Sequence, residues 1–480
     1  MGNEFKEKAI KGVSWNLIER FGVQGMKFII GIVLARLLTP EAFGLIGMIT
    51  VFFFVAQTFI ESGFGRAYIQ KKEVSDKDAN TIFYINLFIS ILLYGILWLT
   101  APYIADFYDQ PQLKKLTRVM ALIIIINAFN MIQIAQLTRA VNFKRKTKIT
   151  LIAIIISGSS GIAAAYYGIG IWSLVLYQLA NRFIITLGLW ITSRWKPALQ
   201  FSVRSFKEMF SFGSWVLASE LIRRIFENVN ILVIGKLFPA AEVGFFNKSQ
   251  EIQRMTSSQF SNAISMVSFP IYSKMQDDKI QLENSIKKFL QYTVLINTLI
   301  VISLIVVAKP FVILLLKEKW APMIPYLQLL SVAGIIYPLH IVNRQVIAAM
   351  GKSDYNFRIT MLKIGLNVLN LFIMYRWGVL YIIMGGVIVS FITLFIYNYY
   401  TSKFVKYTLL KQLSDIKKII LGAIVAGVLG YLTSYKLENL WLTLITGGTI
   451  TISLFNLFQY LINRKLRIEA LNFNKSFKKN

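Results

Sequence analysis

The sequence predicts an all-α polytopic membrane protein with 14 transmembrane helices, arranged as two pseudo-symmetric six-helix bundles followed by two further helices. Hydrophobic residues make up 56% of the 480 residues, charged residues only 16%, and the mean hydropathy is +0.58. Such a chain carries too little polar surface for a soluble protein of this length. The chain has no cysteine and a single histidine, His340. Disulfides, a cysteine-ligated metal and a thiol nucleophile are therefore excluded, and imidazole chemistry is disfavoured.

Fourteen apolar runs are long enough to cross about 30 Å of hydrocarbon, and their ends are marked by proline, glycine and charge. We expect helices at residues 12–37, 41–65, 80–104, 113–137, 148–167, 171–193, 207–235, 241–270, 288–308, 321–349, 358–376, 379–401, 416–434 and 440–462. The first, seventh, eighth and tenth runs are the least apolar, and the repeat and the loop charges support them. No Ala-x-Ala-like cleavage pattern follows the charged residues 1–11, so we expect the first helix to be retained.

Lysine and arginine alternate between the two sides of the predicted helices. The chain has 52 Lys and Arg against 23 Asp and Glu, a formal net charge of +29. Loops on the side of the N-terminus carry 33 of these cations, and the opposite loops carry 10. The positive-inside rule therefore predicts that both termini are cytoplasmic. Because the charge is divided over eight short segments beside membrane helices, without a folded basic domain, nucleic-acid binding is not expected.

A pattern at residues 12–44 returns 200 positions later, at residues 212–244. Identical residues occur at Ser14 and Ser214, Trp15 and Trp215, Leu17 and Leu217, Val33 and Val233, Leu37 and Leu237, and Gly44 and Gly244, and Arg36 is matched by Lys236. Both copies begin a predicted membrane helix and end at a short turn, which is typical of transporters with internal repeats.

The repeat predicts the domain organisation. An even number of helices per repeat keeps both copies in the same orientation, so an axis along the membrane normal would relate the halves. We expect six-helix bundles at residues 1–200 and 201–405. Residues 406–480 would hold two additional helices and a basic cytoplasmic tail. These two helices have no partner in the repeat, so they would form a peripheral anchor or a lateral surface for a lipid or a second subunit.

Charged residues inside the predicted membrane helices concentrate at the two repeat starts. The first helix contains Glu19, Arg20 and Lys27, and the seventh contains Glu220, Arg223, Arg224 and Glu227. At the 200-residue offset, Arg20 corresponds to Glu220 and Lys27 to Glu227, so symmetry-related positions carry opposite charge. This pattern is expected of two helices that face each other across a hydrated cavity.

The spacing within the seventh helix predicts ion pairs. Glu220 with Arg224, and Arg223 with Glu227, are each separated by four residues and so share a helix face. An intramembrane charge costs about 3 kcal/mol or more at the bilayer centre unless it faces water or a partner. These residues therefore either line a cavity or form structural ion pairs that fix helix packing.

Other predicted helices add polar side chains at helical spacing. They are Gln57 and Glu61 in the second helix, Asn127, Asn130 and Gln133 in the fourth, Asn247, Glu251, Arg254 and Ser258 in the eighth, Asn343 and Arg344 in the tenth, and Lys363, Asn367 and Asn370 in the eleventh. A lumen lined by amides, hydroxyls and guanidinium groups suits a sugar chain that carries a phosphate or pyrophosphate. The amides also fit interhelical hydrogen bonds. Arg182, in the middle of the sixth helix, has no partner in its own helix and fits either a functional or a structural role.

Three segments carry a family resemblance: Lys11-Gly12-Val13-Ser14-Trp15, Leu34-Ala35-Arg36-Leu37-Leu38-Thr39-Pro40-Glu41-Ala42-Phe43-Gly44, and Glu61-Ser62-Gly63-Phe64-Gly65. They resemble the Wzx-type polysaccharide flippases, and more narrowly the branch typified by colanic-acid and teichuronic-acid exporters. The superfamily of these proteins also contains multidrug/toxin extruders and the lipid II flippase. The resemblance covers essentially the whole chain, and the first helix pair is its most specific part.

The resemblance implies two six-helix bundles in a V shape, with the first and seventh helices lining a cavity, and alternating access driven by an ion gradient. It also implies a substrate, an undecaprenyl-pyrophosphate-linked oligosaccharide moved from the cytoplasmic to the outer leaflet of a bacterial plasma membrane. The cations expected to attract its head group are Arg20, Lys27, Arg223, Arg224, Arg254 and Arg344. The carboxylates expected to form a proton or sodium site are Glu19, Glu61, Glu220, Glu227 and Glu251. We expect no catalytic residue, metal or cofactor beyond that coupling ion, and we expect membrane lipids, a polysaccharide polymerase and glycosyltransferases as partners.

Three other functions are compatible with parts of this pattern. A multidrug/toxin extrusion antiporter or a lipid II flippase would share the superfamily fold, but an exporter of cationic drugs would show a more acidic lumen. A membrane glycosyltransferase or polymerase would need acidic or histidine chemistry on a sizeable outer loop. The predicted outer loops are short, and Asp106 and Asp109 are their main acidic residues.

Overall fold

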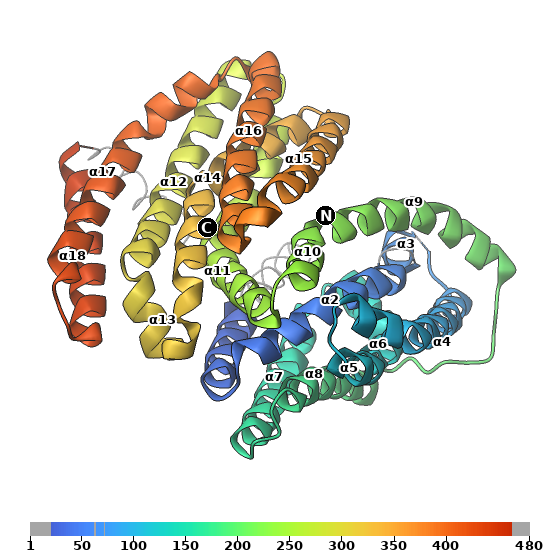
Figure 1. Ribbon diagram of the computed structural model, residues 1–480. Helices are drawn as coiled ribbons and strands as arrows, with labels where there is room; N and C mark the ends of the chain where they lie inside the picture. The colour runs from blue at the N-terminus through green and yellow to red at the C-terminus, as the bar shows by residue number, and fades with distance from the viewer. Residues whose placement is uncertain (1–20, 62–63, 72, 463–480) are drawn as a thin grey trace. The chain divides into compact units, whose positions relative to one another are not determined.

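The computed structural model describes residues 21–61, 64–71 and 73–462, which form helices joined by short turns (Figure 1). The chain divides into two compact units, Met1–Gly244 and Phe245–Asn480. In the first unit α9 packs against α2, α3 and α4, so the seventh predicted helix belongs to this unit by its contacts. The bundle boundary near residue 200 rests on the sequence repeat and stays a prediction.

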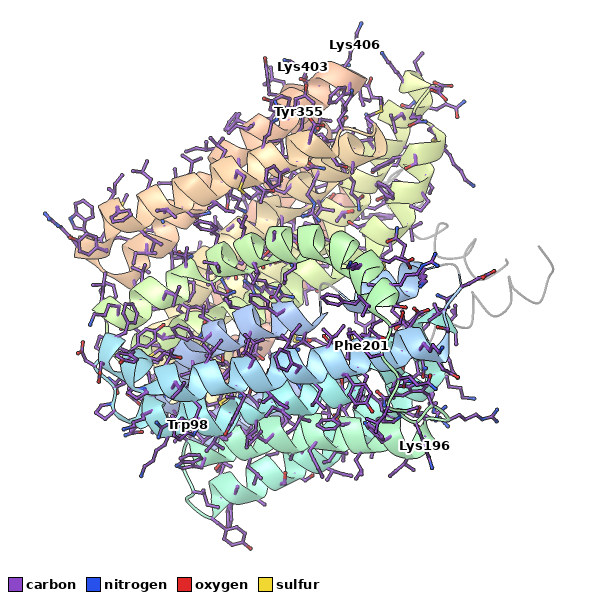
Figure 2. The ribbon with its side chains drawn as sticks, turned by 90° about the vertical axis from the view of Figure 1, so that its right-hand side faces the viewer. Trp98, Lys196, Phe201, Tyr355, Lys403 and Lys406 are labelled. Atoms are coloured by element: carbon purple, nitrogen blue, oxygen red, sulfur yellow. The ribbon has the colours of Figure 1, made fainter. Side chains whose placement is uncertain are left out.

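The first described helix of the first unit spans residues 21–37. The unit continues with α2 (Pro40–Glu61), α3 (Phe64–Gln70), α4 (Asp76–Phe107), α5 (Gln112–Met120), α6 (Leu122–Arg139), α7 (Phe143–Tyr166), α8 (Trp172–Thr192), α9 (Val203–Glu227) and α10 (Val229–Leu237). Figure 1 shows α7 beside α8, and these two helices pack along their length. Trp98 and Lys196 lie at opposite ends of this unit (Figure 2).

Side-chain caps fix where several of these helices begin. At the start of α4, Ser75 Oγ accepts a hydrogen bond from Asp78 N, and Asp78 Oδ2 accepts one from Ser75 N, which together form a capping box. At the start of α9, Ser202 Oγ accepts a hydrogen bond from Ser205 N and so caps this helix without a reciprocal bond. Between α7 and α8 the chain turns through Gly168 and Gly170, whose φ angles of 78° and 63° favour glycine.

The second unit contains most of α11 (Ala240–Lys274). It continues with α12 (Lys279–Val306), α13 (Ala308–Leu316), η1 (Glu318–Met323), α14 (Ile324–Ala349), α15 (Ser353–Met374), η2 (Tyr375–Trp377), α16 (Val379–Val405), α17 (Leu409–Tyr435) and α18 (Leu440–Ile462). A helix therefore occupies each of the predicted apolar runs, although α5 and α6 divide one run and α9 and α10 divide another.

Eleven helical segments among the described residues are long and apolar enough to cross a membrane. The helix at residues 21–37, α9 with α10, and α11 are not among them. Only 17 residues of the first helix are described, and α9 carries Glu220, Arg223, Arg224 and Glu227. The chain is thus an all-helical multi-pass membrane protein, and a total of fourteen spans stays a prediction.

The last two helices are integrated into the second unit. Figure 1 shows α17 beside α18, and both helices also pack on α12. Asn343 of α14 and Gln412 of α17 form a reciprocal pair of buried amide hydrogen bonds, each 3.0 Å long. Asp415 of α17 pairs with Lys287 of α12 at 2.6 Å and accepts a hydrogen bond from the Tyr407 hydroxyl. Polar contacts thus tie α17 to both α12 and α14.

The two copies of the repeat meet inside the first unit at Gly44 and Gly244. A Cβ atom added to Gly44 would overlap the carbonyl of Ala240 and lie 3.2 Å from Gly244 N. A Cβ atom added to Gly244 would overlap the carbonyl of Pro40 and lie 3.3 Å from Gly44 N. Because each contact is the other one shifted by 200 residues, the packing has the two-fold symmetry of the sequence repeat.

Candidate functional site

A cavity of about 400 Å³ lies among the helices of the first unit. It is bounded by the helix at residues 21–37, by α2 and α3, and by α6, α7 and α8. Three cationic side chains line it: Lys27 of the first helix, Lys146 of α7 and Arg182 of α8. No carboxylate occurs in the described lining, so the described wall of the cavity carries net positive charge.

Arg182 differs from an ordinary surface arginine in its partners and in its position. Within the described chain no carboxylate lies within ion-pair distance of its guanidinium group. Arg182 lies near the middle of α8, a helix long and apolar enough to span a membrane. Intramembrane cations usually face a water-filled cavity or a partner and mark substrate or ion pathways.

Three asparagine amides share the cavity with these cations. Asn130 Nδ2 donates a 2.7 Å hydrogen bond to Thr186 Oγ1, and Asn181 Nδ2 donates a 3.1 Å bond to Ser157 Oγ. Asn127 is only 6% exposed, and its Nδ2 has no hydrogen-bond partner among the described residues. A buried amide donor without a partner costs about 1–3 kcal/mol. A ligand oxygen in the cavity would satisfy it.

Apart from Thr150, the remaining described lining is apolar, with Val23, Ile60, Ile134 and Ile154 among its residues. Guanidinium and ammonium groups form short, strong hydrogen bonds with phosphate and carboxylate oxygens. The planar guanidinium group of arginine in particular can bind two such oxygens at once through two parallel N–H donors. The combination of cations, amides and aliphatic groups is therefore suited to an amphiphilic anion rather than to a cation.

The predicted site residues of the first helices fall partly in this cavity. Lys27 lines it, as expected for a cavity cation. Glu19 and Arg20 lie outside the described residues, and so does the side chain of Glu61 at the end of α2. Sequence analysis missed Lys146, which it counted only as loop charge, and left Arg182 undecided. A cation in the middle of an apolar run was the available signal for Arg182.

The charged residues of α9 form a different set of ion pairs from the predicted one. Arg223 Nε donates a 3.0 Å hydrogen bond to Glu220 Oε2. The terminal nitrogen Nη1 of Arg223 lies 2.6 Å from Glu227 Oε1. The predicted pair of Arg223 with Glu227 is present, whereas the predicted pair of Glu220 with Arg224 is wrong. The Arg224 guanidinium instead lies 5.7 Å from the centre of the Phe54 ring, a cation–π distance.

This α9 triad bridges two carboxylates with one guanidinium. The Glu220 side chain is 17% exposed and the Arg223 side chain 40% exposed. Glu220 lies three residues before Arg223, and both i, i+3 and i, i+4 spacings bring side chains together on a helix. Residue spacing alone therefore allowed Glu220 to pair with either Arg223 or Arg224. In the structure its partner is Arg223.

The predicted residues of the second unit lie on α11 and α14. Glu251 pairs with Lys248, whose side chain is only 2% exposed, at a distance of 3.0 Å. Arg254 and Arg344 have exposed side chains. Asn356 Nδ2 donates a hydrogen bond to the backbone carbonyl of Arg344. Lys248 is a buried cation of this unit and was not among the predicted site residues.

Comparisons with known proteins agree on a family and a fold. Residues 33–325, more than half of the chain, match the family described as "Polysaccharide biosynthesis protein". The teichuronic acid biosynthesis protein TuaB of Bacillus subtilis is 26% identical over 304 residues, which are 63% of this chain and 63% of TuaB. The lipopolysaccharide biosynthesis protein WzxC of Escherichia coli is 26% identical over 360 residues, 75% of this chain and 73% of WzxC. The match therefore spans less than two thirds of the length of TuaB.

A solved structure shares the fold. The lipid II flippase MurJ in an inward closed conformation superposes with a TM-score of 0.78 and 16% sequence identity, over 95% of this chain and 99% of that chain. At this identity the similarity concerns the fold, and the function has to be argued from the site.

Proposed function

Because the chain belongs to the polysaccharide biosynthesis protein family, we propose that it is a flippase for an undecaprenyl-pyrophosphate-linked oligosaccharide. It would move this glycolipid from the cytoplasmic to the outer leaflet of a bacterial plasma membrane, with both chain termini in the cytoplasm. The step breaks no covalent bond, so the proposal requires no catalytic residue. Glycosyltransferases would act before this step, and a polysaccharide polymerase would act after it.

The observation that carries the proposal is the charge of the cavity at Lys27, Lys146 and Arg182. A pyrophosphate diester is a double anion, and moving it through hydrocarbon requires cationic partners that replace its hydration. The cavity offers three cations and the Asn127 donor, without a carboxylate in its described lining. Extrusion of cationic drugs would require the opposite charge, so the same observation disfavours the multidrug alternative.

Coupling to an ion gradient forms a second part of the proposal. Among the described carboxylates, Glu220 and Glu227 flank Arg223, and Glu251 lies beside the buried Lys248. A carboxylate that exchanges a guanidinium or ammonium partner for a proton or Na⁺ would give such a transporter two charge states. Alternating access would use the difference between them.

The test is translocation by the reconstituted full-length chain. The substrate would be a polyprenyl-pyrophosphate-linked oligosaccharide in proteoliposomes, and exposure of the sugar to an impermeant oxidant would report its leaflet. Arg182→Gln should slow translocation about tenfold or more, because one charge-assisted contact contributes about 1.5–3 kcal/mol. Arg182→Lys should retain a larger part of the rate.

Arg376→Gln is the matched control, because Arg376 is an exposed arginine of the second unit, outside the cavity. Its rate should stay close to that of the unaltered chain. Unchanged rates for both Arg182→Gln and the double variant Lys27→Gln, Arg182→Gln would contradict the assignment of this cavity. Faster transport of lipid II than of other lipid-linked oligosaccharides would favour the lipid II alternative.

A further inference from the structure

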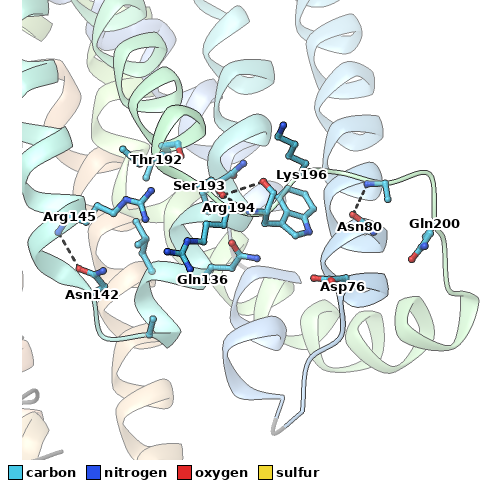
Figure 3. Close-up of a pocket in the computed structure, with 16 residues that line it drawn as sticks. Asp76, Asn80, Gln136, Asn142, Arg145, Thr192, Ser193, Arg194, Lys196 and Gln200 are labelled. Atoms are coloured by element: carbon cyan, nitrogen blue, oxygen red, sulfur yellow. Dashed lines mark hydrogen bonds between the residues drawn. The ribbon is translucent and has the colours of Figure 1, made fainter. Parts of the chain in front are cut away.

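A second cavity of about 670 Å³ lies at the end of the first unit where α4 begins and where α6 and α8 end. Figure 3 shows its polar wall, to which Asn80, Gln136, Asn142, Arg145, Arg194 and Lys196 contribute. Lys196 lies at the end of this unit opposite Trp98 (Figure 2). A volume of this size is in the range of ordinary small-molecule sites. Its lining shares only Leu189 with that of the Arg182 cavity.

The loop that carries Arg194 and Lys196 is fixed to α4. Asn80 Oδ1 accepts a 3.1 Å hydrogen bond from Ala198 N, and Thr81 Oγ1 accepts a 3.0 Å bond from Ser202 N. The ring of Trp195 meets the ring of Phe83 edge-on, with centroids 5.6 Å apart. These contacts hold the cavity wall in place before a ligand arrives, which lowers the entropic cost of binding.

The charge of this cavity is predominantly positive. Arg145 at the start of α7 and Arg194 and Lys196 after α8 face a single lining carboxylate, Asp76. Within the described chain none of these three cations forms an ion pair with a carboxylate. The excess charge is therefore available to an anionic ligand.

Neutral hydrogen-bonding groups are spread between these cations. Amide side chains such as Gln136 and Asn142 both donate and accept hydrogen bonds, as sugar hydroxyls do. The indole N–H of Trp195 is buried and has no partner among the described residues, so a ligand oxygen would satisfy it. A free phosphate ion would bind the cations and leave most of the neutral hydrogen-bonding groups without a ligand. A chain of acidic sugars would bind both the cations and the neutral groups.

We propose that this cavity recognises an acidic oligosaccharide, with carboxylates of the glycan bound by Arg145, Arg194 and Lys196 and hydroxyls bound by the amides and Trp195. The inference rests on the proposed function and names the glycan class that this flippase selects. The cavity would hold the sugar portion on the side of the membrane where the glycolipid is loaded. The cavity at Arg182 would hold the pyrophosphate during translocation.

The test measures binding of soluble oligosaccharides to the purified full-length chain in detergent by titration calorimetry. The probes are a trigalacturonate and its carboxyl-reduced neutral counterpart, with inorganic phosphate and UDP as further arms. Trigalacturonate should bind about tenfold tighter than the neutral trisaccharide, since its carboxylates form charge-assisted hydrogen bonds with the cations and desolvation offsets part of their gain.

Three variants and one control variant locate the binding site. Arg194→Gln should weaken trigalacturonate binding about fivefold or more, whereas Arg194→Lys should retain part of the affinity. Trp195→Phe replaces the indole by a smaller aromatic ring without an N–H donor, so it should weaken acidic and neutral probes by the same factor. Lys207→Gln removes one exposed charge of α9 outside the cavity, and its affinity should equal that of the unaltered chain.

Several results would overturn the inference. They are equal affinity for acidic and neutral trisaccharides, tighter binding of phosphate or UDP than of trigalacturonate, and equal losses for Lys207→Gln and Arg194→Gln. Arg182-dependent translocation without trigalacturonate binding would refute this inference and leave the proposed function standing. Trigalacturonate binding by a chain that translocates no lipid-linked glycan would refute the proposed function and leave the sugar site standing.

Discussion

Gly44 and Gly244 pack backbone against backbone, at equivalent positions of the two sequence repeats. The contact leaves no room for a side chain on either residue, because the carbonyls of Ala240 and Pro40 occupy the places where the Cβ atoms would stand. A glycine in both copies is therefore a packing requirement at this position. Another identity of the repeat, Leu37 and Leu237, has exposed side chains and does not share this explanation.

Gly44→Ala should destabilise the chain, because overpacking against a backbone carbonyl costs about 1–3 kcal/mol. Gly244→Ala should have a similar effect. The double variant should lose less than the sum of the two, since both substitutions push apart the same contact. Thermal unfolding in detergent would measure all three.

Gly95→Ala is the control for these variants. Nothing lies within 4 Å of a Cβ atom built at Gly95 in α4, so alanine there should leave the stability unchanged or raise it slightly. A Gly44→Ala chain that melts at the temperature of the Gly95→Ala chain would contradict the close contact.

Removal of one member of the Asn343–Gln412 pair should destabilise the second unit. Asn343→Leu leaves the Gln412 amide buried without its partner, at a cost of about 1–3 kcal/mol. The double variant Asn343→Leu, Gln412→Leu should recover part of this loss, because apolar groups need no partner. A double-mutant cycle on thermal unfolding would measure the coupling, and additive losses would refute it.

Arg223→Gln should be more disruptive than Arg224→Gln. Arg223 pairs with both Glu220 and Glu227, and Arg223→Gln removes the cation that these two carboxylates share. Because Arg223 is 40% exposed, we expect an effect on stability of about 1 kcal/mol or less. Thermal unfolding of the two variants checks this, and a larger loss for Arg224→Gln would restore the pairing that the spacing predicted.

Lys71→Gln should weaken the junction of α3, α4 and α9 by about 1 kcal/mol. The Lys71 ammonium lies 3.0 Å from Asp78 Oδ1 and 3.3 Å from Glu208 Oε2. The hydrogen bond to Asp78 raises the pKa of Lys71. Its contribution is therefore complete below the ordinary lysine pKa and is lost only as the pH rises through the higher folded value.

The loss caused by Lys71→Gln should accordingly be the same at pH 6 and pH 8, as measured by thermal unfolding. Lys77→Gln, which removes an exposed lysine nearby, serves as the control and should change nothing. A loss of stability that differs between these two pH values would contradict this prediction. It would mean that a group titrating near neutrality controls the ion pair.

Sequence reasoning was accurate where hydrocarbon thickness dictates the structure. The expected helix at 171–193 is α8 (Trp172–Thr192), and the one at 440–462 is α18 (Leu440–Ile462). It missed the interruptions at Ala121 and Asn228, which divide two of the runs. Neither residue is a proline or glycine. At Asn228 the side-chain amide donates a 2.8 Å hydrogen bond to the carbonyl of Arg224, and such a local bond competes with the helical backbone bonds.

The candidate site was also only partly predictable. Lys27 was selected because its symmetry mate, Glu227, carries the opposite charge. Arg182 could not be assigned, because the residues that share its cavity come from helices up to 159 positions earlier in the chain. Such neighbours follow from how helices pack, and periodicity within one helix contains no information about them.

The Asn343–Gln412 pair also imposes an order on synthesis. The two amides are 69 residues apart, so α14 leaves the ribosome with a polar group whose partner has not yet been made. Until α17 inserts, Asn343 is a buried amide in a nascent bundle, satisfied at most by its own helix backbone. The second unit is therefore completed late during translation. A chain truncated before Gln412 should be a target for membrane-protein quality control even though most of its helices are present.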